Sequence, residues 1–288
     1  MSPFPTGPLP RPIGPYLVTE KIGAGGMANV YRARHIETGA EVAIKVLALH
    51  LEQQPAARAR FEHEAALLLG LRHPHILPVY DFGEDGDIPY LVMRLLGGRS
   101  LKDELRAAPL DLAQAATWVR QLAGALDYAH ARGVIHRDVK PANVLLDGES
   151  APFLADFGVA TVIGAAQETA GEFVGTAAYA APEQCRGEPA VRASDQYALA
   201  VVAYEMLTGR RPFSGPTALA VMAQHIGDAP PDPLAINRAL PHAVRRVLAQ
   251  ALAKQAAARY PSALAFSRAL DRALDLAAPA RPHGEETT

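Results

Sequence analysis

The most informative stretch of this sequence is residues 134–146, Val-Ile-His-Arg-Asp-Val-Lys-Pro-Ala-Asn-Val-Leu-Leu. Its apolar ends can anchor a loop that holds Asp138, Lys140 and Asn143 near one another. A carboxylate can orient a hydroxyl and accept its proton, a lysine can neutralise charge on a moving phosphoryl group, and an amide oxygen is a hard ligand for Mg²⁺. The stretch therefore predicts phosphoryl transfer, with Asp156 of the later Asp-Phe-Gly triplet as the second metal ligand.

Three motifs in a fixed order carry a resemblance to a known family. They are His-Arg-Asp at 136–138 with Asn143 five residues after the aspartate, Asp-Phe-Gly at 156–158, and Ala-Pro-Glu at 181–183. This set resembles the signature of the eukaryotic-type (Hanks-type) protein kinases. Within that family the chain looks most like the bacterial serine/threonine protein kinases, through Gly-Gly-Met-Ala at 25–28 and Gly-Thr-Ala-Ala-Tyr at 175–179.

The resemblance implies an α+β, two-lobed protein-kinase-like fold, with a small antiparallel-sheet N-lobe carrying one main helix and a larger, mainly helical C-lobe. It covers residues 16–276, with the N-lobe at 16–93, the hinge at 94–98 and the C-lobe at 99–276. Residues 1–15 carry six prolines, which cannot donate hydrogen bonds to a sheet, so we expect a flexible leader there. Residues 277–288 show no periodic apolar pattern, and we expect a disordered tail.

Composition argues against several other classes of protein. The 288 residues are 49% hydrophobic, which is enough for a substantial core, and the net charge of −2 disfavours a nucleic-acid surface or a polybasic membrane surface. The single cysteine, Cys185, cannot form an intramolecular disulfide and fits a reducing cytosol. Neither a signal peptide nor an apolar run of membrane-spanning length is present. We therefore expect a cytoplasmic chain, either soluble in itself or the intracellular part of a longer membrane kinase.

Local patterns predict strands first and helices later. Strands are expected at Tyr16–Ile22, Ala28–Arg34, Glu41–Leu47 and Ile88–Met93, the last after a hairpin turn at Asp85-Gly86. One helix is expected from about Pro55 to Leu69, because Phe61, Ala65 and Leu68 recur at helical spacing. In the alanine-rich remainder, Ser100 with Asp103 and Asp111 with Gln114 read as helix starts.

A glycine-rich turn between the first two strands indicates a phosphate-binding loop. Glycines let the backbone approach a polyanion and point amide hydrogens at it. Alone, such a turn is more often a plain hairpin, but Val-Ala-Ile-Lys at 42–45 follows it and favours the binding role. Ala28 stands where the family often has a third glycine, a small departure. The expected nucleotide-binding residues of this lobe are Ile22, Gly23, Ala24, Gly25, Gly26, Met27, Val30, Ala43 and Lys45.

Lys45 lies in an otherwise apolar strand, where an unpaired charge would be costly to bury, so it should have anionic partners. The resemblance assigns two, the α/β-phosphates of the nucleotide and a helix glutamate. Glu64, near the middle of the predicted helix, is the expected glutamate. Glu62 lies about 200° from Glu64 around the helix axis and is expected to be a solvated surface charge.

The adenine pocket is expected between the lobes. By the resemblance, Val30 and Ala43 cover the base and Leu145 forms the floor, although ordinary core packing would account for the same residues. Met93 should guard the back of the pocket, and Leu96 should offer backbone groups to adenine. The nearest relatives usually carry an acidic residue where Arg94 stands, but binding should survive because hinge contacts come from the backbone.

The resemblance also implies an activation segment at residues 159–175, a loop whose order is set by phosphorylation. Thr169 is the best-placed acceptor, and Arg137 supplies a fixed cation for its phosphate. Thr176 is expected to form hydrogen bonds with Asp138 and Lys140. The alternative is a constitutively ordered loop that needs no switch.

These expectations combine into one function: a protein serine/threonine kinase that uses ATP and Mg²⁺ and is activated by autophosphorylation. Its partners would be protein substrates with Ser/Thr acceptors and a second copy, in a weak homodimer through the small lobes. A small-molecule phosphotransferase and a catalytically inactive pseudokinase are the alternatives. Asp195 is expected to brace the backbone of the catalytic loop, and the resemblance implies that Glu183 and Arg259 pair inside the large lobe. Cys185 is expected to be inert packing rather than a redox thiol, and His130 to be packing or surface.

Overall fold

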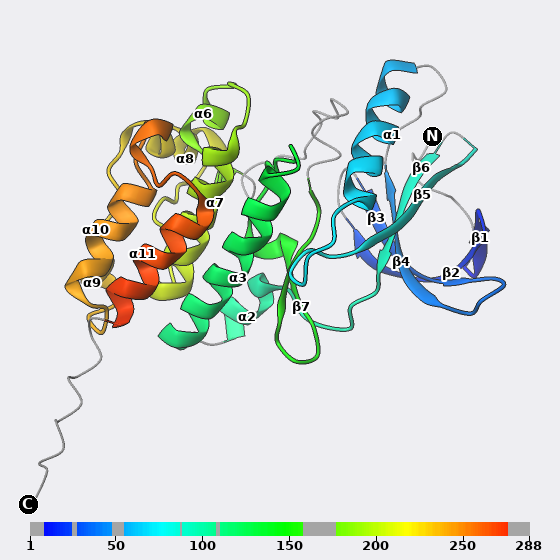
Figure 1. The fold of residues 1–288 in the computed structure, drawn as a ribbon, viewed down its shortest axis with the longest axis horizontal. Helices are drawn as coiled ribbons and strands as arrows, with labels where there is room; N and C mark the ends of the chain where they lie inside the picture. Colours follow the sequence, from blue (N-terminus) through cyan, green and yellow to red (C-terminus); the bar gives the residue numbers. More distant parts are fainter. Residues whose placement is uncertain are drawn as a thin grey trace, which may run out of the picture.

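The structure is a computed structural model that describes residues 9–24, 28–47, 55–86, 88–107, 110–157 and 177–275. Its elements form two lobes, a curled antiparallel sheet with one helix and a larger body made mainly of helices (Figure 1). The two-lobed α+β prediction is therefore confirmed. Within the described part of the chain, no helix is both long and apolar enough to cross a membrane.

The sheet of the N-lobe has six strands in the order β1-β2-β3-β4-β6-β5, and every neighbouring pair is antiparallel. The strands are β1 (Arg11–Ile13), β2 (Tyr16–Ala24), β3 (Ala28–His35), β4 (Glu41–Leu47), β5 (Val79–Asp85) and β6 (Ile88–Arg94). Alternate residues of a strand face opposite sides of a sheet. Val42, Ile44 and Val46 accordingly pack into one core, whereas Ala43 and Leu47 belong to a second core shared with the C-lobe. This alternation places Lys45 on the side of the second core.

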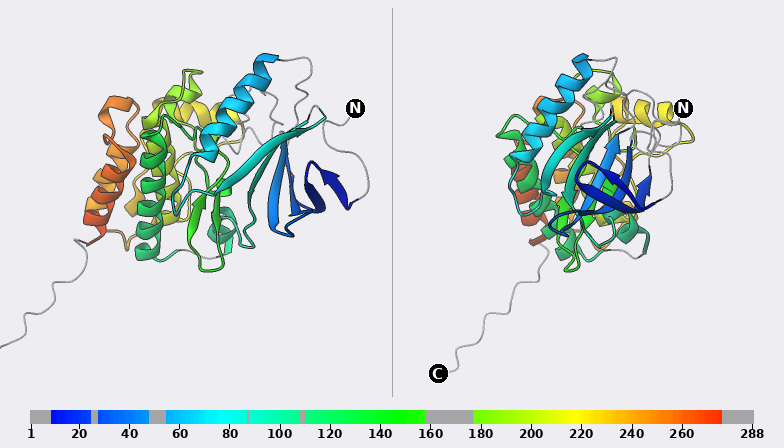
Figure 2. Two further views of the ribbon diagram at one scale, coloured as in Figure 1. Left: turned by 45° about the vertical axis from the view of Figure 1, so that its right-hand side comes forward. Right: turned by 90° about the vertical axis from the view of Figure 1, so that its right-hand side faces the viewer.

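The first strand corrects the expectation of a flexible leader for the end of that segment, residues 11–13, whereas residues 1–8 lie outside the described residues. β1 pairs with β2 at the end of the sheet farthest from the helical lobe (Figure 2, left). Ile13 is only 2% exposed and packs in the core beside Tyr16 and Val18. Proline is compatible with an edge strand because the outward-facing N–H is not needed there. Pro12 therefore fits opposite Leu17, while the neighbouring Ile13 is buried in the core.

The helix of the N-lobe, α1 (Pro55–Leu69), has the predicted bounds. Phe61, Ala65 and Leu68 are buried, as their spacing predicted, and the ring of Phe61 meets the ring of Phe82 edge-on at a centroid distance of 6.0 Å. α1 thus covers the sheet from the side of β5. Glu62, on its outer face, is exposed.

The C-lobe is organised around one buried helix. Its elements are α2 (Leu101–Ala107), α3 (Leu112–His130), η1 (Pro141–Asn143), β7 (Val144–Leu146), β8 (Pro152–Leu154), α6 (Pro182–Cys185), α7 (Arg192–Thr208), α8 (Ala218–Gly227), α9 (Pro233–Ile236), α10 (His242–Ala251), η2 (Ala256–Ala258) and α11 (Ala263–Asp275). α3, α10 and α11 pack around α7 (Figure 1). Residues 197–203 of α7 are all 5% exposed or less, so this helix is a rigid support for whatever contacts its ends.

Both predicted helix starts carry the expected caps. The Asp111 carboxylate accepts hydrogen bonds from the N–H groups of Ala113 and Gln114 at the start of α3. Asp103 accepts from the backbone N–H and the hydroxyl of Ser100, before α2. Such caps satisfy amide groups that have no partner within the helix.

Candidate functional site

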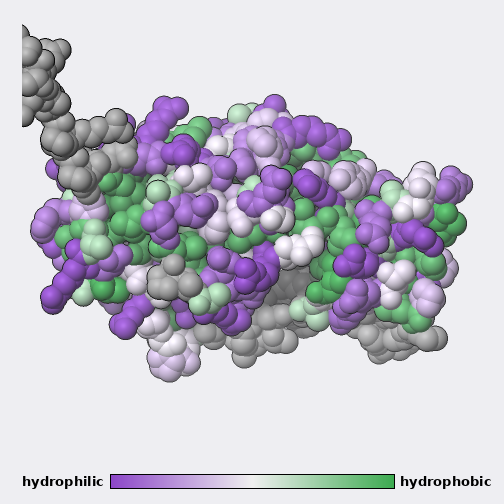
Figure 3. Space-filling model, turned by 90° about the horizontal axis from the view of Figure 1, so that it is seen from below, coloured by the Kyte–Doolittle hydropathy of each residue, from purple (hydrophilic) through white to green (hydrophobic). Residues whose placement is uncertain are grey.

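The catalytic-loop residues singled out in the sequence meet at one point. The Oδ2 atom of Asp138 lies 2.8 Å from Lys140 Nζ and accepts a hydrogen bond of 2.9 Å from Asn143 Nδ2. Asn143 also donates to the main-chain oxygen of Asp138 at 2.9 Å. The side chains of Asp138 and Lys140 are 26% and 21% exposed, so the cluster is ordered yet open to a substrate. It lies in the C-lobe, and the space-filling view is hollowed where the two lobes meet (Figure 3).

Asp195, at the start of α7, holds the catalytic loop by its backbone. Its carboxylate, 1% exposed, accepts hydrogen bonds of 2.8 Å from the N–H groups of His136 and Arg137. Arg137 has a φ of +70°, a conformation that costs energy in a non-glycine residue and persists only where its surroundings impose it. The expected bracing role of Asp195 is confirmed.

A third contact of Asp195 was not anticipated. His130 is 5% exposed, and its Nε2 lies 2.7 Å from Asp195 Oδ2. The sequence contains a signal for this burial, because positions 122, 126 and 130 of α3 share one face and the first two are leucines in the core. The carboxylate that supports the loop is therefore itself held by a histidine.

His136 links the catalytic loop to the Asp-Phe-Gly triplet. Its fully buried ring accepts from the N–H of Asp138 at Nδ1 (3.3 Å), and its Nε2 lies 3.0 Å from the Ala155 oxygen. Burial lowers the pKa of His136 even though Asp195 and Asp138 lie nearby, so the ring is neutral and Nε2 is the donor. The ring packs on Phe157 with centroids 4.5 Å apart. This contact helps to fix Phe157 and, through it, the neighbouring Asp156.

Lys45 and Asp156 meet across the lobes. Lys45 Nζ lies 2.8 Å from Asp156 Oδ1, and Asp156 has a φ of +61°. Burial alone would raise the pKa of Asp156, but the Lys45 ammonium holds that pKa below its usual value, so the carboxylate is ionised. A cation from the N-lobe and an anion from the C-lobe thus form one site.

The predicted pair between Lys45 and Glu64 is not formed in this structure. Glu64 is half-buried on α1, and the ion pairs of the described residues do not join it to Lys45. The Asp156 carboxylate, carried by a left-handed residue, reaches the ammonium and satisfies its charge instead.

Asn143 and Asp156 fit a magnesium site. The N–H of Ala155 donates to the oxygen of Asn143 at 2.8 Å, so the two candidate ligands come from adjoining main chains. The amide nitrogen of Asn143 is used by Asp138, which leaves its Oδ1 to face a cation. Mg²⁺ is usually bound by one or two protein oxygens together with substrate phosphates.

The expected nucleotide-binding residues lie on both sides of the gap between the lobes. Ala43 on β4 and Met93 on β6 are neighbours in the sheet and are buried, whereas Val30 and Leu96 are half-buried. Leu145 is half-buried between two buried residues of β7. Ile22 is 43% exposed, which suits a lid residue. Gly23 and Ala24 end β2, and Gly25, Gly26 and Met27 lie outside the described residues.

Behind Met93 is a small apolar cavity of about 30 Å³. It is lined by Lys45, Leu68, Leu71, Ile76, Leu77, Val79, Leu91, Met93, Ala155, Asp156 and Phe157. The Lys45–Asp156 pair therefore has low-polarity surroundings on this side, which strengthens its electrostatic interactions.

The hinge contains a glycine that sequence reasoning did not single out. A Cβ on Gly98 would lie 1.6 Å from the main-chain oxygen of Leu146, whereas a Cβ on Gly97 would meet nothing within 4 Å. The hinge thus packs its backbone directly on β7. Arg94, at the other end of the hinge, lies over the Phe153 ring of β8 at 5.1 Å from the centroid. Its side chain is therefore part of the link between the lobes.

Only some of the expected regulatory residues lie within the described part of the chain. Thr169 and Thr176 lie outside the described residues, as do Gly158 and Gly175. Arg137 is half-buried, and its main-chain oxygen accepts a 2.8 Å hydrogen bond from Gln184 Nε2 on α6. Gln184 was missed in the sequence, where nothing local marks it. It ties the catalytic loop to the segment that follows the expected activation segment.

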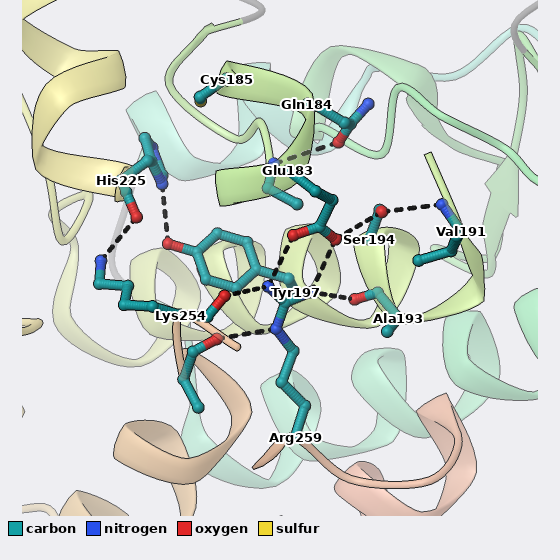
Figure 4. Close-up of polar contacts among 12 residues, drawn as sticks. Glu183, Gln184, Cys185, Val191, Ala193, Ser194, Tyr197, His225, Lys254 and Arg259 are labelled. Carbon is teal, nitrogen blue, oxygen red and sulfur yellow. Dashed lines mark hydrogen bonds and ion pairs between the residues drawn. The ribbon is translucent and has the colours of Figure 1, made fainter. Parts of the chain in front are cut away.

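The predicted pair of Glu183 and Arg259 is confirmed (Figure 4). Two parallel hydrogen bonds of 2.9 and 2.8 Å join the guanidinium to the carboxylate, and Ser194 Oγ donates to Glu183 at 2.6 Å. Burial would raise the pKa of Glu183, but Arg259 and Ser194 bring it below its usual value. The nearby thiol of Cys185 is buried, and burial raises its pKa to about 11. Such a thiol is unreactive, in agreement with a packing role.

Known proteins share this sequence and fold. A family model described as "Protein kinase domain" matches residues 16–266. The chain is 38% identical over 252 residues to serine/threonine-protein kinase PrkC of Bacillus subtilis, covering 87% of the chain and 39% of PrkC. It is 41% identical over 264 residues to serine/threonine-protein kinase PknA of Mycobacterium tuberculosis, covering 89% of the chain and 61% of PknA.

Among solved structures, the Mycobacterium tuberculosis PknI kinase domain superimposes with a TM-score of 0.74 at 31% identity, covering 93% of this chain and 99% of that one. The chain spans less than two thirds of the length of the curated relatives named above. The chain belongs to the protein kinase family.

Proposed function

We propose that the chain transfers the γ-phosphoryl group of ATP to serine or threonine hydroxyls of proteins. The observation that carries the proposal is the cluster in which Asp138 Oδ2 meets both Lys140 Nζ and Asn143 Nδ2, at 2.8 and 2.9 Å. The relatives named as serine/threonine-protein kinases support the choice of acceptor. Phosphoryl transfer demands mainly positioning and charge stabilisation, which this cluster can supply.

Each residue would have a separate task. Asp138 would accept a hydrogen bond from the acceptor hydroxyl and take its proton, while Lys140 would neutralise charge on the transferring group. Lys45 would bind the phosphates of the nucleotide. Asn143 and Asp156 would hold Mg²⁺, which neutralises phosphate charge when it is bound. Glu64 would replace Asp156 as the ion-pair partner of Lys45 when the phosphates and Mg²⁺ occupy the site at Asp156. This exchange would require α1 to approach β4.

Adenine would lie in the hollow between the lobes. Ile22, Val30 and Ala43 would cover the base and Leu145 would support it from below, with Met93 at the back and backbone groups near Leu96 at the edge. The turn from Gly23 to Met27 would cover the phosphates. This arrangement follows from the resemblance and from the burial of Ala43 and Met93 beside half-exposed neighbours.

The regulation that we propose is autophosphorylation in trans. A phosphate on Thr169 would face Arg137, and Thr176 would contact Asp138 and Lys140 beside the substrate. Encounter of two copies would require a weak homodimer, which we propose forms through the small lobes. We also propose a kinase domain over residues 16–276 and a location in the cytoplasm.

A pseudokinase is the second candidate, and the geometry argues against it. Such proteins usually lack one of the residues that bind phosphate or accept the proton, yet Lys45, Asp138 and Asp156 are all present, and each forms an ion pair. A small-molecule phosphotransferase would share those residues, but it would not need the Ala181–Glu183 platform braced by Arg259.

Incubation with labelled ATP and Mg²⁺ tests the proposal. The wild type would be compared with Lys45→Met, alone and with generic acceptor proteins, and modified sites would be mapped by mass spectrometry. We expect phosphoserine and phosphothreonine in the acceptors and a loss of several orders of magnitude in Lys45→Met. Absence of transfer from a wild type that binds ATP would identify a pseudokinase, and phosphotyrosine alone would contradict the assigned acceptor.

A further inference from the structure

A buried histidine of α8 holds the main chain that leads into α6. His225 is 0% exposed, and its Nε2 lies 3.1 Å from the main-chain oxygen of Ala178. Its Nδ1 lies 2.9 Å from Tyr197 Oη on the central helix α7 (Figure 4). One imidazole therefore joins α8, α7 and the segment of residues 177–181.

The protonation state of this ring fixes the direction of both contacts. Burial lowers the pKa of His225 to about 4, and the Lys254 ammonium also lowers it, so the ring is neutral near pH 7. A neutral imidazole has one donor and one acceptor nitrogen. The Ala178 oxygen can only accept, so Nε2 donates to it, and the Tyr197 hydroxyl donates to Nδ1. Both ring nitrogens are then satisfied, as a buried ring requires.

The surroundings leave His225 little freedom. Lys254 Nζ donates to the main-chain oxygens of Gln224 and His225, at 3.1 and 2.8 Å, and so caps the end of α8. The same ammonium lies 4.4 Å from the centroid of Phe213, whose ring meets the His225 ring edge-on at 4.8 Å. The His225 imidazole is thus restrained in two ways: Lys254 fixes its main chain, and the Phe213 ring packs against it.

The segment that His225 holds lies beside the catalytic loop. The N–H of Ala181 donates to Gln184 Oε1 at 3.1 Å, and Gln184 Nε2 donates to the main-chain oxygen of Arg137 at 2.8 Å. Residues 177–181 are therefore two hydrogen bonds from the residue that precedes Asp138. An acceptor peptide whose hydroxyl reaches Asp138 must pass next to this segment.

We propose that His225 is a positioning residue for the protein substrate. By holding the Ala178 oxygen it sets the path of residues 177–181, against which the acceptor peptide lies. This inference rests on the proposed kinase function. Lys45 and Asp156, which face the nucleotide, form no contact with this network, so His225 acts on the peptide rather than on ATP.

Two substitutions of His225 distinguish the hydrogen bond of its Nε2 from that of its Nδ1. The amide of glutamine reaches about as far as Nε2, so His225→Gln can still donate to Ala178. The shorter asparagine can accept from Tyr197 but cannot reach Ala178. Tyr197→Phe is the matched control, because it removes the other hydrogen bond of His225 and leaves the Ala178 contact in place.

Steady-state kinetics with a phosphorylatable peptide give the first test. We expect His225→Asn to raise the KM for peptide about tenfold, the typical effect of one lost hydrogen bond. The KM for ATP and peptide-independent ATP hydrolysis should stay within about twofold of wild type. His225→Gln and Tyr197→Phe should both keep a near-wild-type KM for peptide.

Amide hydrogen exchange gives a second readout that does not depend on activity. Exchange at residues 177–181 should be faster in His225→Asn, and unchanged in His225→Gln and Tyr197→Phe. Wild-type exchange and wild-type peptide KM in His225→Asn would overturn the proposal, and so would an equal rise in the KM values of peptide and ATP. If the wild type transferred no phosphate at all, the kinase function would fail, and hydrogen exchange would still decide whether His225 holds this segment.

Discussion

Lys45 stands in the apolar strand β4 because its charge has a partner on the other lobe. The side chains of Lys45 and Asp156 are 17% and 36% exposed, and their charged atoms are 2.8 Å apart. Removing two charges from water costs energy that their attraction repays only in part. The pair is therefore better explained by the proposed binding of phosphates and Mg²⁺ than by a contribution to stability.

The neutral state of His225 makes a prediction about stability and pH. The unfolded ring has a pKa of 6.5 and the folded ring about 4, so the unfolded chain binds the extra proton between these values. Stability contributed by this group is therefore complete above about pH 6.5 and is lost as the pH falls towards 4. Between pH 7.5 and 5, wild type should lose about 2 kcal/mol more than His225→Gln. Urea unfolding at both pH values measures this.

Lys254 is the charged group that faces His225, and burial lowers its pKa to about 8. It is mainly charged at pH 7.5 and fully charged at pH 5, and it is present in both proteins, so most of its contribution cancels. Equal losses of unfolding free energy in wild type and His225→Gln would mean that the His225 ring is charged in the folded protein or exposed to water.

Prediction from sequence succeeded for residues that are near one another in the chain. Asp138, Lys140 and Asn143 lie within one loop, and their spacing predicted that their side chains would meet. His225 and Ala178 are 47 residues apart, and nothing local in α8 marks its histidine as a contact of that segment. The contact of Lys45 with Asp156 was also not foreseen, because it depends on how the two lobes lie in space.

At the scale of elements, the hinge is the feature that most constrains substitution. Gly98→Ala would force a Cβ into the main-chain oxygen of Leu146, 1.6 Å away, so the hinge or β7 must shift. We expect a loss of about 2–4 kcal/mol in stability and weaker ATP binding, because Leu96 moves with the hinge. Gly97→Ala is the matched control, with open space around its Cβ and an expected change within about 1 kcal/mol.

Denaturant unfolding and nucleotide titration of both variants provide the measurement. Equal behaviour of Gly97→Ala and Gly98→Ala would show that the hinge does not rest on β7 as described.

Elements were predicted best where one periodicity dominates. The bounds of α1 agree with the structure because Phe61, Ala65 and Leu68 repeat at helical spacing. β1 was missed because prolines suggested a leader, while the burial of Ile13 becomes visible only when the sheet edge is known. α3 ends at His130, shortly before Gly133 with a φ of +79°.

At the scale of the whole molecule, the C-lobe depends on a pair that joins distant parts of the chain. The Arg259 side chain is 0% exposed and also donates to the main-chain oxygens of Ala193, Ala253 and Lys254. Arg259→Met would leave the Glu183 carboxylate buried without its cation, at an expected cost of about 3–5 kcal/mol.

Arg245→Met is the matched control for this prediction, because Arg245 forms an exposed pair with Asp232. Exposed pairs contribute little, so its effect should stay within about 1 kcal/mol. Thermal or urea unfolding of the two variants gives the comparison. Similar losses in both would contradict the assigned role of the Glu183–Arg259 pair as a central brace.

In the proposed function, Asp138 orients the acceptor hydroxyl and takes its proton. Asparagine at this position keeps an oxygen for the Asn143 amide but loses the charge and the basicity. Asp138→Asn should therefore bind Mg²⁺–ATP within about twofold of wild type, by calorimetry, while peptide phosphorylation falls by about 10²-fold or more. Wild-type turnover in Asp138→Asn would contradict the claim, and so would a loss of ATP affinity large enough to explain the fall in rate.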